Sequence, residues 1–209
     1  AVLRLVAEIL REPAFHASEF EQLKRSALTH IESQKSDPGA LAGLQLARHL
    51  NPYPPEHWLY TPTLEERMQR LQSVSIDELR RCHAEFYGAS NSELAVVGDF
   101  DAAEITRLVQ DSFGDWRSPR RFTRIAERYR DVPAIDRSLD TPDKANAVFR
   151  AGLNLALRDD QPDYPALALG NYLLGGSSDA RLARRIREQE GLSYSVRSWL
   201  SAGTIDAVG

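Results

Sequence analysis

Arg187 and Tyr194 are the residues of this sequence best suited to hold a ligand, and they stand seven positions apart. A guanidinium fork and a phenol can both donate hydrogen bonds to the carbonyl oxygens of a peptide or to a developing oxyanion. Taken alone, the residues favour a structural explanation of the pair, as a core tyrosine and an arginine that complements a helix dipole. No residue near them could catalyse a reaction alone, so the predicted chemistry is binding.

A helix over 178–189 and a strand over 192–200 are expected to position the pair. Gly191 lies between them and is well placed as the left-handed residue that ends a helix. Because side chains alternate along a strand, Tyr194 is expected on its apolar face. The run Gly175–Ser178 before the helix indicates a tight turn with a serine N-cap. A phosphate cradle is the weaker alternative, since the run lacks a Walker lysine and does not follow a strand.

No metal site is expected in this chain. The sequence His16-Ala-Ser-Glu19-Phe20 approaches the zinc motif H-x-x-E-H, but its last position is a phenylalanine, which cannot ligate a metal. The other histidines have no partner at ligand spacing. Cys82 is the sole cysteine, which excludes a multi-cysteine zinc site and an internal disulfide.

Composition excludes several classes of protein. The 209 residues are 42% hydrophobic and carry a formal charge of −4, as in an ordinary globular protein without a basic field for nucleic acid. Arginines crowd residues 117–130, but acidic residues interleave with them, which indicates a solvated segment. No apolar run approaches the ~18 residues of a membrane helix. The sequence opens within an apparent helix and stops within an apparent strand, so we expect a piece of a longer protein.

Periodicity predicts a helical first part and a mixed second part. A capping box at Ser75–Glu78 and an N-cap at Asp101 mark two helix starts. Helices are expected at 1–11, 18–34, 38–50, 63–72, 75–87, 102–113 and 162–174, and strands at 93–98, 145–153, 192–200 and 203–208.

The run Leu174-Gly-Gly…Arg181-Leu…Arg187-Glu-x-x-Gly-Leu-x-Tyr194 resembles the signature of the pitrilysin/insulinase-type (inverzincin) zinc metallopeptidases. Further matches in consistent order extend the resemblance over essentially the whole chain: Glu19-Phe-Glu-x-x-Lys24, Asp37-Pro38, Ser75-Ile-Asp-Glu-Leu79, Phe86-Tyr87 and Val96-Val-Gly-Asp99. The resemblance implies an α+β fold of antiparallel-rich sheets with helices packed on them. It also implies the C-terminal part of one such domain at 1–117, a linker segment at 118–144 and the first part of the next domain at 145–209.

The resemblance implies two halves that close around a peptide. One half carries H-x-x-E-H and zinc, and the facing half holds the substrate with an arginine and a tyrosine. The resemblance assigns this role to Arg187 and Tyr194. This sequence has no H-x-x-E-H, and the positions of a further E-x₆-E pair are occupied by Leu23 and His30. The resemblance therefore implies the non-catalytic, C-terminal half of a two-half bacterial zinc protease.

Its expected partners are the catalytic H-x-x-E-H half, which would carry the zinc, and a peptide or unfolded polypeptide. This chain is expected to bind no cofactor and to cleave no peptide alone. The periplasm is the expected compartment, because similar enzymes are often exported. The alternative is a scaffold or assembly subunit derived from the same family, without a role in proteolysis.

Overall fold

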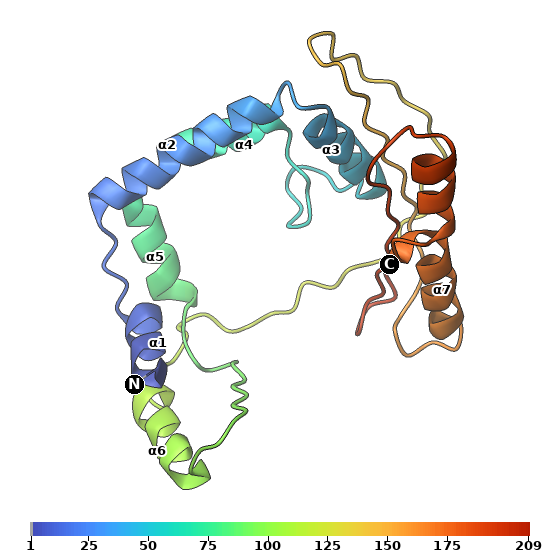
Figure 1. The fold of residues 1–209 in the computed structure, drawn as a ribbon. Helices are drawn as coiled ribbons and strands as arrows, with labels where there is room; N and C mark the ends of the chain where they lie inside the picture. Colours follow the sequence, from blue (N-terminus) through green and yellow to red (C-terminus); the bar gives the residue numbers. More distant parts are fainter. Residues whose placement is uncertain (1) are drawn as a thin grey trace. The chain divides into compact units, whose positions relative to one another are not determined.

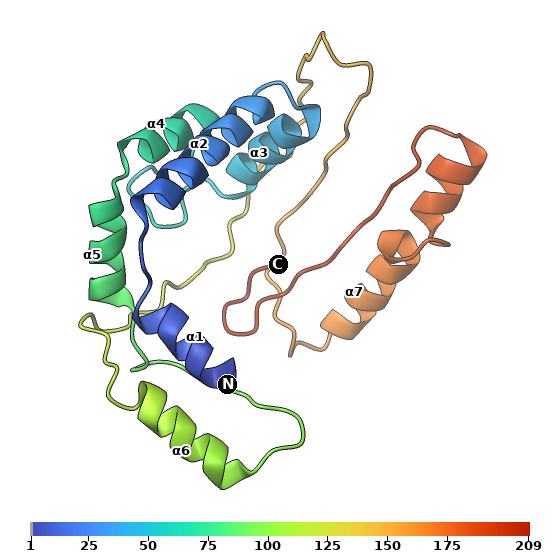
Figure 2. The same cartoon turned by 60° about the vertical axis from the view of Figure 1, so that its left-hand side comes forward.

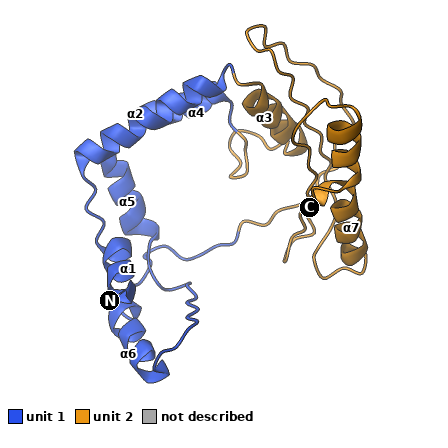
Figure 3. Cartoon of the chain, in the orientation of Figure 1, with its two compact units in different colours: residues 1–36, 62–124 blue, residues 37–61, 125–209 orange. Residues whose placement is uncertain are grey.

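The structure, a computed structural model, describes residues 2–209 as helices joined by long non-helical segments (Figure 1). The chain forms two compact units, each built from two stretches of sequence (Figure 3). Unit 1 comprises Ala1–Ser36 and Pro62–Arg124, and unit 2 comprises Asp37–Thr61 and Ile125–Gly209. The last change of unit, at residues 124 and 125, falls within the segment 118–144 for which a linker is expected.

Unit 1 is a set of helices that pack in pairs. Figures 1 and 2 show α2 alongside α4, and α1 packs against α6. The helices of this unit are α1 (Val2–Arg11), α2 (Ala17–Gln34), α4 (Leu64–Ser73), α5 (Ile76–Phe86) and α6 (Ala102–Phe113). All five lie within two residues of the ranges predicted from periodicity.

Short polar side chains fix where three of these helices begin. Thr63 and Glu66 form a capping box at α4, in which each side chain accepts a hydrogen bond from the other residue's backbone N–H. Ser75 and Glu78 form the predicted capping box of α5. The hydrogen bond from the Ser75 N–H, followed by that from its hydroxyl, lowers the pKa of Glu78 below its ordinary value. Asp101 caps α6 as predicted.

Cationic side chains tie the helix pairs of unit 1 at their ends. Lys24 on α2 donates from Nζ to the carbonyls of Gln72 and Val74, at 2.8 Å each, where α4 ends. Arg11, the last residue of α1, donates to the Ser112 carbonyl at 2.6 Å and to the Asp115 carboxylate at 2.8 Å. These carbonyls have no partner within their own helices, so the cations satisfy acceptors that a helix end leaves open.

Unit 2 contains α3 (Pro38–Leu50), α7 (Tyr164–Asn171) and two π-helical segments, η1 (Tyr172–Gly176) and η2 (Ala183–Gln189). Asp37 caps α3 by accepting a hydrogen bond from the Ala40 N–H at 2.6 Å. The end of the chain is held by two reciprocal backbone hydrogen bonds, of 2.8 and 2.9 Å, between Leu155 and Gly209.

The expected α+β fold with antiparallel-rich sheets is wrong. Within residues 2–209 the structure contains no strand, and the sole β-bridge there joins Arg158 to Gly203. Apolar alternation determines which side chains share a face, but a strand also needs a neighbouring segment in register to pair its N–H and C=O groups. Beyond the bridge at Gly203, the predicted strands form no ladder within the described residues. Apolar side chains on two of them lie in solvent: Val97 is 98% exposed and Phe149 88% exposed.

The capping box of α4 offers a direct test of how this helix is stabilised. Replacement Thr63→Ala removes the acceptor for the Glu66 N–H and should lower the free energy of unfolding by about 1 kcal/mol. Replacement Thr63→Ser keeps the hydroxyl and serves as the control. Urea denaturation of both variants measures the difference, and equal losses would refute the assigned role of the hydroxyl.

The Arg11–Asp115 ion pair predicts that the stability of the fold depends on pH in the acid range. The hydrogen bond and charge of Arg11 lower the pKa of Asp115 below its ordinary value. Ionised Asp115 therefore stabilises the fold above its ordinary pKa, and this contribution is lost as the pH falls through the lowered folded-state pKa. A carboxyl-carbon NMR titration should show the Asp115 pKa rising toward its ordinary value in Arg11→Gln. An unchanged pKa would contradict the pairing.

Candidate substrate-binding site

Arg187 and Tyr194 lie together in unit 2. The guanidinium carbon of Arg187, on η2, is 4.7 Å from the centroid of the Tyr194 ring. This separation is typical of a cation–π contact, in which the ring face attracts the positive charge. The structure thus brings the two predicted site residues side by side, while their role toward a substrate stays a prediction.

The surroundings of Tyr194 differ from those expected. Its ring is 83% exposed, rather than buried on an apolar strand face. The reason is that residues 192–200 form no strand, so no sheet face exists for the ring to cover. Arg187 is exposed as well, and its guanidinium is the group that the structure places against the ring.

The turn after η2 returns the chain toward Arg187. Gly191 has a φ of +63°, which confirms its prediction as the left-handed residue beyond the helix end. The Leu192 N–H donates to the Ile186 carbonyl at 2.9 Å, and the Glu190 N–H donates to the Arg185 carbonyl at 3.1 Å. These hydrogen bonds close the last wide turns of η2. The segment begins at Ala183, later than the helix predicted over 178–189.

A close backbone contact anchors the site segment at its base. The Ser198 N–H donates to the Gly175 carbonyl at 3.1 Å, and the Ser198 hydroxyl donates to the Asn171 carbonyl at 3.3 Å. A Cβ atom at Gly175 would lie 2.6 Å from both the backbone N and the Oγ of Ser198. Only glycine permits this approach, so Gly175 closes residues 176–197 into a loop that carries both Arg187 and Tyr194.

The polar groups of the pair are available to a ligand. Neither the Arg187 guanidinium nor the Tyr194 hydroxyl makes a hydrogen bond or ion pair with another residue in the part of the chain that the structure describes. The neighbouring Arg185, by contrast, is paired with Glu190 at 2.6 Å. The five N–H donors of Arg187 and the Tyr194 hydroxyl can therefore be offered to peptide carbonyls.

In the part of the chain that the structure describes, no group of side chains fits a zinc ion. Residues 2–209 bring no three His, Cys, Asp or Glu side chains together in a metal-binding arrangement. His30 on α2 lies 3.1 Å from the Gln34 amide, and Leu23 on the same helix is an apolar residue exposed to solvent. We therefore derive no reaction step through a metal held by this chain. None of the described helices has the length and apolar character needed to cross a membrane.

The sequence of this chain matches the model of one protein family. The family model described as "Peptidase M16 inactive domain" matches residues 73–207, more than half of the chain. The chain therefore belongs to the M16 peptidases as an inactive domain, and the prediction of a non-catalytic domain of the zinc metallopeptidase family is confirmed.

Individual relatives agree with this classification. The chain is 23% identical over 202 residues to the probable inactive metalloprotease YmfF of Bacillus subtilis, covering 94% of this chain and 46% of the relative. It is 24% identical over 199 residues to the non-peptidase homolog YmxG of Helicobacter pylori, covering 94% and 44%. The chain thus spans less than half the length of these two relatives.

The crystal structure of a peptidase M16 inactive domain from Pseudomonas fluorescens superposes with a TM-score of 0.71 at 26% identity. The superposition covers 97% of this chain and 48% of that one. A protease from Helicobacter pylori, at 17% identity and a TM-score of 0.65, is similar in fold.

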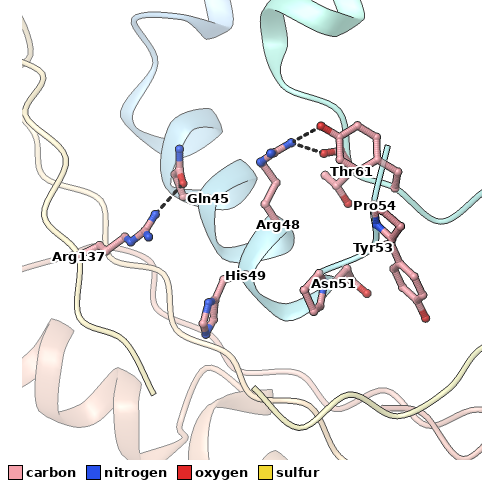
Figure 4. Close-up of a pocket in the computed structure, with 10 residues that line it drawn as sticks. Gln45, Arg48, His49, Asn51, Tyr53, Pro54, Thr61 and Arg137 are labelled. Atoms are coloured by element: carbon pink, nitrogen blue, oxygen red, sulfur yellow. Dashed lines mark hydrogen bonds between the residues drawn. The ribbon is translucent and has the colours of Figure 1, made fainter. Parts of the chain in front are cut away.

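A pocket beside α3 was missed by the sequence analysis (Figure 4). It has a volume of about 410 Å³ and lies within unit 2. Its lining residues are Gln45, Arg48, His49, Asn51, Pro52, Tyr53, Pro54, Tyr60, Thr61 and Arg137. No motif indicates it, because Arg137 comes from a segment distant in sequence from α3. The available signal was an aromatic- and proline-rich run, 52–60, that directly follows a helix.

The close approach at Gly175 can be tested against a matched glycine. Replacement Gly175→Ala forces Ser198 away and should lower the free energy of unfolding by about 1–3 kcal/mol. At Gly170, in α7, an added Cβ meets no atom within 4 Å. Gly170→Ala should therefore raise stability by up to about 1 kcal/mol. Urea denaturation compares the variants, and equal effects at both positions would contradict the contact.

Proposed function

We propose that this inactive domain holds a polypeptide for cleavage by a zinc-bearing catalytic half. The proposal is supported by the membership of the M16 inactive domains and by one feature of the geometry. That feature is the Arg187–Tyr194 pair, whose hydrogen-bonding groups have no partner within the described chain.

In this proposal Arg187 binds and orients the peptide. Its guanidinium donates to a backbone carbonyl, and the Tyr194 ring restricts the orientations of the charged group. The Tyr194 hydroxyl donates to a second carbonyl of the same peptide. Both side chains are exposed in this chain, so water competes with each hydrogen bond. Closure of the catalytic half over the peptide would exclude that water and strengthen both bonds.

The catalytic half supplies the chemistry of cleavage in this proposal. Zinc bound by its H-x-x-E-H motif would activate a water molecule. The residues of this chain contribute binding and orientation alone. We also propose the periplasm as the compartment, on the resemblance to exported enzymes.

A scaffold without a role in proteolysis is the second candidate. The name "non-peptidase homolog" given to the Helicobacter pylori relative is the observation that favours it. The two candidates differ in one respect that a gene sequence reveals. An H-x-x-E-H motif in the same or a companion polypeptide favours the peptidase role, and its absence throughout favours the scaffold.

Substitutions at the pair test the proposed function in the protein assembled with its H-x-x-E-H half. Arg187→Ala should lower kcat/KM roughly 10–100-fold, as expected for loss of a charge-assisted hydrogen bond. Tyr194→Phe should lower it roughly 3–10-fold, since it removes one neutral hydrogen bond. The zinc content should not change in either variant.

Arg184→Ala is the matched control for these measurements. Arg184 is an exposed arginine on η2, one turn before Arg187, and its guanidinium has no partner within the described chain. Its replacement should leave kcat/KM unchanged. Wild-type turnover in both Arg187→Ala and Tyr194→Phe, or an equal loss in Arg184→Ala, would overturn the proposed role of the pair.

A further inference from the structure

The pocket beside α3 has an unbalanced charge. Its lining includes Arg48, His49 and Arg137 but no aspartate or glutamate. A third arginine, Arg130, lies against the pocket wall with its guanidinium carbon 5.0 Å from the centroid of the Tyr53 ring. The pocket thus concentrates positive charge in a chain whose formal charge is −4.

Arg48 and Arg137 line the pocket, and Arg130 stacks on the ring of the lining residue Tyr53 without lining the pocket itself. These three arginines have no carboxylate partner within residues 2–209. Other arginines of the chain do form ion pairs: Arg11, Arg80, Arg81, Arg120, Arg158 and Arg185. Acidic residues flank the pocket arginines in sequence, as Asp131 and Asp136 do, but neither forms an ion pair with them. The positive charge of the pocket is therefore left for an external anion.

The Arg48 guanidinium is held along one edge and open along the other. Its Nη1 donates to the Tyr60 hydroxyl at 3.2 Å and to the Thr61 carbonyl, as Figure 4 shows. Its Nη2 and Nε donate to no residue of the described chain. The free edge is the fork that a carboxylate accepts in a bidentate pair.

Hydrogen bonds to α3 place the other two arginines. The His49 Nε2 donates to the Pro133 carbonyl at 2.8 Å, and Arg137 donates from Nη1 to the Gln45 side-chain oxygen at 3.3 Å. The Asn154 amide donates both to the Leu50 carbonyl, at 2.8 Å, and to the Arg130 carbonyl, at 3.0 Å. The pocket is therefore assembled from α3 and residues 130–137 by specific contacts.

The wall of the pocket is suited to a polypeptide. Tyr53 is buried, and its ring stacks on His57 with centroids 4.2 Å apart and planes 14° apart. Pro52 and Pro54 flank it, which gives an apolar wall of few conformations. Asn51 lines the same space: its side-chain nitrogen donates to the Ala47 carbonyl at 3.1 Å, and its side-chain oxygen can accept from a peptide N–H. A volume of about 410 Å³ falls in the range of ligand-binding pockets.

We propose that this pocket binds an acidic segment of a polypeptide, with Arg48, Arg130 and Arg137 donating to its side-chain carboxylates. Neither Arg187 nor Tyr194 lines the pocket, so the site is an additional one. The inference rests on the proposed function in one respect, since it takes the ligand to be a peptide, and it adds a preference for acidic sequence. The arginines sit at different parts of the pocket, so the ligand spans them with more than one acidic residue.

Binding of fluorescent peptides to the full chain tests the proposal. The acidic probe carries three aspartate or glutamate residues, and its matched probe carries asparagine or glutamine at the same positions. Both have amidated C-termini. The acidic probe should bind at least about tenfold more tightly at low salt, and added NaCl should reduce the difference. Equal affinities for the two probes would overturn the proposal.

Variants then locate the binding site. Arg137→Gln and Arg130→Gln should each weaken binding of the acidic probe about fivefold to tenfold, and Arg137→Lys should weaken it less, because it keeps the charge without the fork. Arg128→Gln is the control, since Arg128 is exposed on the same segment but neither lines the pocket nor stacks on Tyr53 as Arg130 does. Circular dichroism checks that each variant is folded. An equal loss in Arg128→Gln would overturn the assignment to the pocket.

A free chain end is the other source of a carboxylate, and a third probe tests it. The neutral probe with a free C-terminal carboxylate should bind weakly, and affinity equal to that of the acidic probe would reassign the pocket to chain ends and overturn our proposal. Arg187→Ala should leave the preference for acidic over neutral probe intact. Because the readout is binding, loss of peptidase activity in that variant tests the proposed function independently of this pocket.

Discussion

The close approach of two backbone segments at Gly175 and Ser198 is the contact on which the site depends. With no side chain between them, the Gly175 carbonyl accepts directly from the Ser198 N–H, and the Asn171 carbonyl accepts from the Ser198 hydroxyl. The residues between these anchors bend through a left-handed turn at Gly191. Gly175 thus permits the close backbone contact, and Gly191 permits the chain to reverse its direction. Together they bring a guanidinium and a phenol ring into contact without burying either.

Helix positions were predictable from this sequence because the signals that start a helix are local. The Ser75–Glu78 box needs two side chains three residues apart, and both partners of each hydrogen bond belong to the same turn. The left-handed turn at Gly191 was predictable for the same reason. A strand differs, since Val97 or Phe149 can be placed on a sheet face only when a distant segment supplies the neighbouring ladder. The alternation of apolar and polar residues does not show whether that neighbouring segment exists.

The sequence identified two candidate site residues, whose role in binding stays a prediction, but it did not identify their surroundings. The sequence named Arg187 and Tyr194 as the candidate pair, and the structure places the guanidinium of one against the ring of the other. The prediction that Tyr194 is buried depended on a strand over 192–200. The structure contains no strand there, so this prediction is wrong. The α3 pocket could not be predicted from the sequence, because the hydrogen bonds from His49 to the Pro133 carbonyl and from Arg137 to Gln45 join segments that no local pattern relates.

The interleaving of the two units has a consequence for how the chain acquires its structure during synthesis. Residues 37–61, including α3, emerge from the ribosome between the two stretches of unit 1, and their partners in Ile125–Gly209 do not yet exist. The contacts of α3 with residues 130–154 can form only after those residues have been translated. The two stretches of unit 1 are both translated by residue 124, before those contacts can form. Contacts of such long sequence separation form slowly. During that interval the nascent chain lacks the residues that hydrogen-bond to α3 in the folded unit.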